Sequence, residues 1–404
     1  MFTKGFRTLS LLSMGALAAH SFAGYATGFE AGEGFTGSSG GTILAGQNLW
    51  YTPAVANSAD FNCYTYAGNG LTMATNAAGG SQFAGFVGPG TLLGRAQRPL
   101  AFLSGAYVFE YDVCFKYNGA AGLGSNNAGS VSTQDSVTTK GFISLAVWDV
   151  AATPTGWTQQ LNAYDSLGSP INNYNPFQVL SLDRWYHVAL TVDFATNRVN
   201  EMKVYDLGSG ATQGDQAERY LQGGSASALP LPTDFRLFVG GANAGNAGGY
   251  DNVAIGQPVN VDTLTVLQGE AFEGGASDLA LSDNVRFSMF NDATNLQAEV
   301  EMSGTTSVST PSGMRFEVEA SVGRPGLAQE IYVYNFTSNA YQFMSGTTAS
   351  STDISAGRLY VSGSQFINSG GLLKSKVRWS PINDEDPSQD GWLHSLDVAR
   401  WNVF

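Results

Sequence analysis

Apolar and polar residues alternate along most of the chain, and helical periodicity is nearly absent. Because successive side chains of a strand point to opposite faces of its sheet, this period of two predicts β-strands with one buried face. The clearest case is residues 107–117, where an aromatic residue or valine occupies every second position. Residues 142–149, 185–194 and 199–205 follow the same pattern, and Asn197 supplies the turn of a hairpin between the last two.

The alternation resumes in the second half of the chain after a break at residues 256–259, whose sequence is Gly-Gln-Pro-Val. Residues 314–321 are a clear example, with apolar side chains alternating with arginine and glutamate. One face of such a strand is buried and the other is solvated. The pattern therefore predicts an all-β protein with two antiparallel β-sandwich domains of the jelly-roll type, over residues 24–256 and 257–404.

The first 23 residues have the features of a secretory signal peptide. Lys4 and Arg7 precede a short apolar run from Leu9 to Ala19, and Ser21-Phe22-Ala23 offers small residues at the positions that a signal peptidase recognises. The run is too short for a membrane anchor. We expect cleavage before Gly24, which predicts a secreted or cell-surface protein with no membrane span in the mature chain.

Composition supports this fold class and excludes one class of partner. The chain has 404 residues, of which 50 are glycine and only 13% are charged. Glycine supplies the backbone angles that tight turns require, so this mixture is typical of many short strands joined by turns. Lys and Arg number 19 against 33 Asp and Glu, for a formal net charge of -14. A surface this acidic repels the phosphates of nucleic acids, so no nucleic-acid partner is expected.

The chain contains two cysteines, Cys63 and Cys114. In an oxidising extracellular compartment, an even number of cysteines is most simply explained by a disulfide. The alternative is two free, half-buried thiols. A metal site built on this pair is not expected, because no third cysteine is present and the chain has only three histidines. The sequence predicts a Cys63–Cys114 disulfide.

Several short segments of the first half occur in the order seen in a known fold family. They are Trp185-x-His187-Val188-Ala189-Leu190-Thr191-Val192-Asp193, then Val204-Tyr205-Asp206, with Gly28-Phe29-Glu30 near the start and Asp251-Asn252-Val253 near the end. With these segments, residues 27–256 resemble the concanavalin A-like and laminin-G-like jelly rolls of secreted proteins. The resemblance implies a β-sandwich, and the first and last segments look like the ends of jelly rolls that bind carbohydrate.

The second half is similar to a β-sandwich module found at the C-termini of exported proteins of environmental bacteria. The matching residues are Ile331-Tyr332-Val333-Tyr334-Asn335-Phe336, then Arg378-Trp379, then Leu396-Asp397-x-Ala399-x-Trp401. That module has no assigned function, so the similarity implies a role as spacer, stabiliser or attachment domain.

The first resemblance also implies a structural calcium ion. Jelly rolls of this type often hold Ca²⁺ between a carboxylate of the first strand and an aspartate of the last strand, which would be Glu30 and Asp251 here. Calcium takes six to eight oxygen ligands, so backbone carbonyls would have to complete the site. The alternative is that both residues are ordinary solvated or turn-capping carboxylates.

Aromatic and polar residues suggest a glycan as the partner. Trp148 lies on the strand face shared with Ser144 and Ala146, and Trp185 and His187 are expected on the same side. Trp157 and Tyr174 belong to a predicted loop over residues 151–176. Sugars stack on aromatic rings and exchange hydrogen bonds with polar side chains, which favours non-catalytic binding of extracellular carbohydrate. The alternative for each Trp is packing in the core.

Two other functions remain open. Glu110 and Asp112 share one strand face, and a pair of carboxylates can hydrolyse a glycosidic bond. Jelly-roll glucanases add a third acid, however, where this chain has Cys114 and Phe115, so a glycoside hydrolase ranks third. A structural surface or matrix protein without a small ligand ranks second. A groove exposing Trp148 would favour binding, a filled sheet face would favour the structural role, and converging open acids would favour an enzyme.

Overall fold

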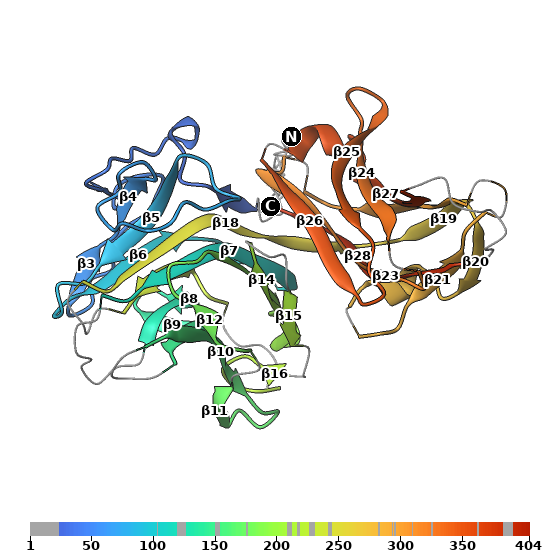
Figure 1. The fold of residues 1–404 in the computed structure, drawn as a ribbon. Coiled ribbons are helices and arrows are strands. Elements are labelled where there is room, and N and C mark those ends of the chain that lie inside the picture. Colours follow the sequence, from blue (N-terminus) through green and yellow to red (C-terminus); the bar gives the residue numbers. More distant parts are fainter. Residues whose placement is uncertain are drawn as a thin grey trace, which may run out of the picture.

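The computed structural model describes residues 24–404 except 103, 119–126, 150–153, 175–176, 208–211, 216–218, 226–230, 241–244, 282, 293, 295, 309, 325, 362 and 383–390, and it leaves out the side chains of residues 172–174, 212–215 and 354–361. The predicted signal peptide, residues 1–23, lies outside this part of the chain. Within it the protein is all-β, as predicted, and consists of antiparallel β-sandwiches (Figure 1). No helix of the described residues is long and apolar enough to cross a membrane.

The first sandwich consists of two stacked sheets. Strand pairing gives the front sheet the order β15–β14–β13–β7–β18–β5–β4–β2, antiparallel throughout, with β1 (Tyr25–Thr27) against β18. The front strands are β2 (Thr42–Ile43), β4 (Asn62–Thr65), β5 (Gln82–Val87), β7 (Ala106–Lys116), β13 (Tyr186–Asp193), β14 (Arg198–Asp206), β15 (Thr212–Asp215) and β18 (Ala247–Asn260).

The back sheet has the order β3–β6–β17–β8–β9–β10, with β11 and β12 beyond β10. The short strand β16 (Arg219–Tyr220) pairs with both β14 and β10 and so bridges the two sheets at one edge. The back strands are β3 (Ser58–Asp60), β6 (Leu93–Pro99), β8 (Asn127–Asp135), β9 (Thr138–Trp148), β10 (Gly156–Tyr164), β11 (Pro170–Tyr174), β12 (Leu180–Ser181) and β17 (Asp234–Val239).

An aromatic core fills the space between the two sheets. Every second residue of β7 points into it, and Phe109 and Phe115 pack there against rings from the back sheet. The alternation seen in the sequence over residues 107–117 therefore marks the buried face correctly. The predicted loop over residues 151–176 is wrong, because residues 156–164 form β10 and residues 170–174 form β11. The strand β10 was missed because it contains polar residues that a sequence pattern assigns to a loop. One of them, Gln159, is in fact buried and donates to Ser144 Oγ.

The second sandwich also has two antiparallel sheets, with a core that includes Phe316, Trp379 and Trp401. One sheet has the order β20–β21–β28–β23–β26 and the other β19–β22–β27–β24–β25. The strands are β19 (Thr263–Gln268), β20 (Glu270–Glu273), β21 (Phe287–Phe290), β22 (Ala298–Thr305), β23 (Gly313–Val322), β24 (Leu327–Asn335), β25 (Ala340–Thr348), β26 (Ile354–Val361), β27 (Leu372–Pro381) and β28 (Leu393–Val403). The 3-10 turns are η1 (Ala31–Glu33), η2 (Ala276–Leu279) and η3 (Gly363–Phe366).

Strand β18 runs from one sandwich into the other (Figure 1). Its first part pairs with β5 and β7, whereas residues 257–260 pair with β28. The predicted boundary at residues 256–257 thus falls within this strand. A Cβ on Gly256 would lie 2.2 Å from the Val403 carbonyl oxygen, so the close approach of β18 and β28 requires glycine there. A continuous hydrogen-bonded strand in place of a flexible linker holds the two sandwiches in a fixed orientation.

Candidate functional site

The outer face of the front sheet, which points away from the aromatic core, carries most of the buried charge of the first sandwich. Glu110 and Asp112 come from β7, His187 from β13, and Glu201 and Lys203 from β14, and all five are less than a tenth exposed. Their alternation with core residues follows from the period of two. These side chains are buried by parts of the protein outside the front sheet. Strands β23 and β28 of the second sandwich cover one part of this face.

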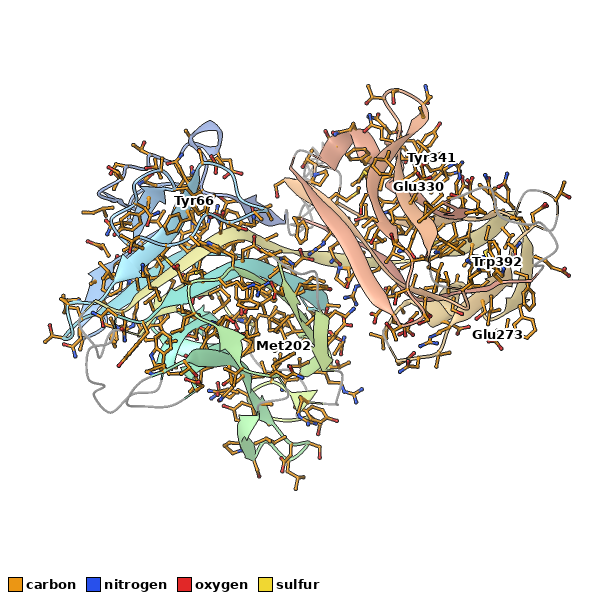
Figure 2. The ribbon with its side chains drawn as sticks, in the orientation of Figure 1. Tyr66, Met202, Glu273, Glu330, Tyr341 and Trp392 are labelled. Carbon is orange, nitrogen blue, oxygen red and sulfur yellow. The ribbon has the colours of Figure 1, made fainter. Side chains whose placement is uncertain are left out.

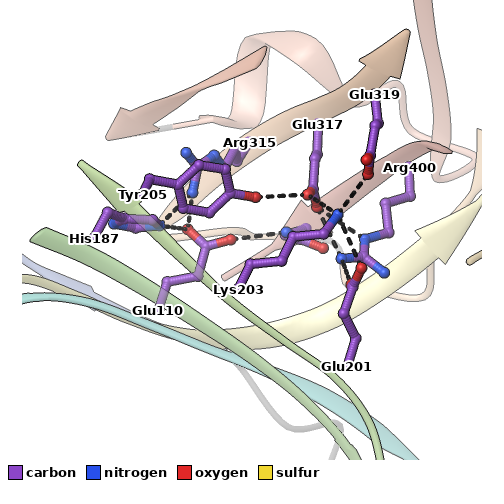
Figure 3. A network of polar contacts seen from close by, with 10 residues as sticks. Glu110, His187, Glu201, Lys203, Tyr205, Arg315, Glu317, Glu319 and Arg400 are labelled. Carbon is purple, nitrogen blue, oxygen red and sulfur yellow. Dashed lines mark hydrogen bonds and ion pairs between the residues drawn. The ribbon is translucent and has the colours of Figure 1, made fainter. Parts of the chain in front are cut away.

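A network of ion pairs and hydrogen bonds joins the two sandwiches there (Figure 3). We call it the interface network. It consists of Glu110, His187, Glu201, Lys203 and Tyr205 from the first sandwich and Arg315, Glu317, Glu319, Arg400 and Asn402 from the second.

Lys203 and Arg400 form the centre of the interface network. The Lys203 ammonium lies 2.9 Å from Glu201, 3.0 Å from Glu317 and 3.1 Å from Glu319. The Arg400 guanidinium donates to Glu201 and, over 2.9 Å, to Glu317. Burial by itself would raise the pKa of Glu317, but Arg400 and Lys203 outweigh it and hold that pKa well below its usual range. Two buried cations therefore hold three carboxylates inside the interface.

Arg315 and His187 form the other end of the network. Arg315 donates to Glu110 over 2.8 Å and to His187 Nε2 over 2.5 Å, and Asn402 donates to the second oxygen of Glu110 over 2.8 Å. Burial raises the pKa of Glu110, but Arg315 and His187 reverse that effect and lower it to about 2. His187 Nδ1 lies 2.7 Å from Asp112 Oδ1. Glu110 and Asp112, the residues considered for hydrolysis, are thus both buried: Glu110 is engaged by Arg315 and Asn402 of the second sandwich, and Asp112 by His187, Asn76 and Asn252 of the first.

Another part of the outer face is covered by residues 66–81, the segment between β4 and β5. Tyr66 and Phe83 pack there against Trp185, and the Tyr66 hydroxyl donates to Asp251 Oδ2 over 2.7 Å (Figure 2 labels Tyr66). The Trp185 indole N–H donates to the Ala74 carbonyl over 2.7 Å. These contacts, with the interface network, bury Glu110, Asp112, Trp185, His187 and Asp251 on this sheet face.

The structure corrects the predicted aromatic binding surface. Trp148 faces the core from the back sheet, 5% exposed and packed against Phe115 and Tyr117. It therefore does not share a side with His187 and Trp185, which do lie together on the outer face of the front sheet. Trp157 lies in β10 and is fully buried against Phe115.

These rings cannot stack on a sugar because the two sheets of the sandwich, and the segment that covers the outer face, enclose them. The backbone of Tyr174 belongs to β11, and its side chain lies outside the described part.

The predicted disulfide is also wrong. Cys63 and Cys114 are both buried and free. They lie on β4 and β7, and the pairing order β4–β5–β18–β7 places three strand spacings, about 14 Å, between them. A disulfide needs Cα atoms within about 7 Å. The two thiols also belong to different hydrophobic clusters, and burial raises the pKa of both, to about 12 for Cys63.

The structure brings Glu30 and Asp251 together around Gly28. A Cβ on Gly28 would lie 3.6 Å from Glu30 Cγ and 3.8 Å from Asp251 Oδ1. Glu30 accepts hydrogen bonds from the Ser81 and Gln82 amides and from the Ser81 hydroxyl, and Asp251 from Tyr66, Asn76 and its neighbour Asn252. Burial and the nearby Asp112 raise the pKa of Asp251 well above its usual value. Glu30 Oε2 and Asp251 Oδ1 each accept a single hydrogen bond and so keep a further lone pair, and as hard oxygen ligands these two atoms fit a hard cation.

Sequence reasoning missed a groove at one end of the first sandwich. It has a volume of about 300 Å³. Phe194 contributes an aromatic wall, packed against Phe102 with 5.5 Å between ring centroids, and Lys140 and Gln222 contribute polar groups. We call it the end groove. It is lined by Thr138, Thr139, Lys140, Gly141, Phe194, Asn197, Gln222, Gly223, Leu231 and Pro232.

Loop geometry shapes the end groove. Asn197 has a left-handed backbone with φ of 57°, as expected for the predicted turn, and its side-chain amide donates to the carbonyls of Leu221, Gln222 and Gly224. Asn197 thereby ties the loop after β16 to the β13–β14 hairpin. A second groove of about 450 Å³ shares Leu231 and Pro232 with the end groove and continues past Phe102. The sequence predicted the turn at Asn197, but it did not reveal that the loop after β16 packs against this turn.

Comparison with known proteins gives only distant likenesses. No family model and no curated protein matches the sequence. Among solved structures, the tandem CBM22 domains of Paenibacillus barcinonensis Xyn10C are 12% identical, with 96% of this chain and 100% of that chain covered and a TM-score of 0.24. Lectin II from Ulex europaeus is 9% identical over 52% and 97%, with a TM-score of 0.31. The alginate lyase of a Chlorella virus is 13% identical over 46% and 87%, with a TM-score of 0.29.

Proposed function

We propose that this is a secreted protein that binds extracellular carbohydrate without modifying it, and that the end groove is the binding site. The observation that carries the proposal is the combination of an aromatic wall with polar side chains in one concave site. Phe194 offers a ring on which the apolar face of a sugar can stack, and Lys140, Gln222 and the hydroxyls of Thr138 and Thr139 offer hydrogen bonds. The extracellular location rests on the signal-like N-terminal sequence.

The end groove can be tested by blocking it. Thr138 is exposed at its rim, so Thr138→Trp should fill the groove and weaken polysaccharide binding about tenfold or more without affecting the fold. The measurement is retardation on affinity gels containing a panel of polysaccharides. Thr265→Trp, at an exposed position on the edge strand β19, is the matched control and should migrate like the wild-type protein. Retardation of Thr138→Trp equal to that of the wild type would contradict the assignment.

A structural role in a surface layer or matrix is the second candidate function. The buried polar side chains on the outer face of the front sheet favour it, because they join the two sandwiches to each other and are not free to bind a ligand. The absence of retardation by every polysaccharide in the panel, with a folded wild-type protein, would favour this candidate over glycan binding.

We further propose that a calcium ion stabilises the first sandwich at Glu30 and Asp251. The two carboxylates lie near each other beside Gly28, and this placement supports a cation there. Removing calcium with EDTA should lower the melting temperature by about 5–10 °C, and adding it back should restore the loss. Asp251→Asn should abolish the part of the response that this site provides. A response to calcium that is the same in Asp251→Asn and wild type would contradict the proposal.

A further inference from the structure

Three carboxylates converge on the face of the second sandwich that adjoins the interface network. Glu319 lies on β23, Asp397 on the neighbouring β28, and Asp353 immediately before β26, on the other side of β23. One oxygen from each side chain lies within 4.8 Å of the others. We call this group the three-carboxylate cluster.

A β-bulge places Asp397 in the cluster. Glu319 pairs with Val398 and the next residue, Ala320, pairs with Leu396, so Asp397 is the extra residue of the bulge. Bulges redirect side chains relative to the regular alternation of a strand. Here the bulge brings the carboxylate of Asp397 next to that of Glu319.

An orphaned oxygen in the cluster points to a missing ligand. Asp397 is only 1% exposed, and its Oδ1 atom has no hydrogen-bond partner. The Oδ1 atom of Asp353 is likewise buried without a partner. A buried carboxylate oxygen without a donor is costly, and native proteins rarely leave one unless water or an ion completes the site.

The positive charges nearby do not balance the cluster. Arg286 pairs with Asp353 through its Nη2 atom, and Lys203 of the interface network donates to Glu319 but is shared with Glu201 and Glu317. No cation among the described residues makes an ion pair with Asp397. The three carboxylates are thus opposed by Arg286 and by a lysine that other glutamates share.

We propose that Glu319, Asp353 and Asp397 form a binding site for a hard divalent cation, Ca²⁺ or Mg²⁺. Carboxylate oxygens are the ligands that both ions prefer. The 4.8 Å limit on the oxygen separations equals about twice a Ca–O distance, so the three oxygens can surround one ion. This site is separate from the one proposed at Glu30 and Asp251, and it does not depend on glycan binding.

The test uses the full secreted chain freed of metal with EDTA, titrated by calorimetry with CaCl₂ and, separately, with MgCl₂. We expect at least one of the two ions to bind, and Asp397→Asn to bind one ion fewer per chain than the wild type. A saturating concentration of that ion should raise the melting temperature of the wild type by about 5–10 °C, and Asp397→Asn should lose the share of this rise that the cluster provides. Without metal, Asp397→Asn should melt no lower than the wild type, because the substitution removes a repulsive charge.

Three comparisons separate this proposal from the alternatives. Asp262→Asn, which removes an exposed carboxylate from the same sandwich, should bind and melt like the wild type. Asp251→Asn should keep the ion that Asp397→Asn loses, which distinguishes the two cation sites. Glu319→Gln should reproduce the loss seen in Asp397→Asn. Wild-type stoichiometry in Asp397→Asn, or no heat from either ion with the wild type, would overturn the proposal.

Discussion

Replacing Arg400 by methionine should lower the free energy of unfolding by about 3–5 kcal/mol, because it leaves two buried carboxylates without their main partner. Arg400 pairs with Glu201 of the first sandwich and with Glu317 of the second, and all three side chains are at most 5% exposed. The carboxylates that remain cannot reach water without separating the sandwiches. The loss would be measured by urea denaturation at neutral pH.

Arg184→Met is the matched control for this prediction. The Arg184 side chain is 40% exposed and pairs with Asp206 over 2.7 Å. Exposed ion pairs contribute about 1 kcal/mol or less, so this variant should unfold almost like the wild type. If both arginine variants lost the same small amount, the interface network would not be the main contact holding the sandwiches together.

Acidification should destabilise the protein through the interface network, and Glu110 alone should account for about 3 kcal/mol. Its pKa is about 2 in the folded protein against an ordinary value of 4.5. A lowered folded-state pKa means that the stabilisation is complete above about pH 4.5 and is lost as the pH falls from there through about 2. Glu317, whose pKa is lowered by Arg400 and Lys203, acts in the same direction.

The variant Glu110→Gln isolates this contribution. It should be less stable than the wild type at pH 6, and the difference should shrink as the pH falls from about 5 to 2, because the wild type loses the charge that the variant lacks. Urea denaturation at a series of pH values gives the comparison. A stability difference that stays constant across this range would show that Glu110 does not titrate with a lowered pKa in the folded protein.

Patterns within a short stretch of sequence were sufficient to predict features that depend on a single strand or a single turn. The alternation over residues 107–117 identified β7 and its core face, and Asn197 identified the turn between β13 and β14. Local patterns failed for β10, because a buried Gln159 bonded to Ser144 makes a core strand look like a polar loop. They failed for the two cysteines because nothing local reveals that two intervening strands separate β4 from β7.

The sequence by itself determined that this protein is all-β, that its strands each have two different faces, and that its composition is acidic. Only the tertiary structure decided what each face contacts. Glu110 and His187 lie on a polar strand face, which a sequence assigns to solvent, yet Arg315 and Asn402 bury it from more than a hundred residues away. The physical reason is that alternation reflects the geometry of a single strand, whereas burial depends on which distant surface packs against it.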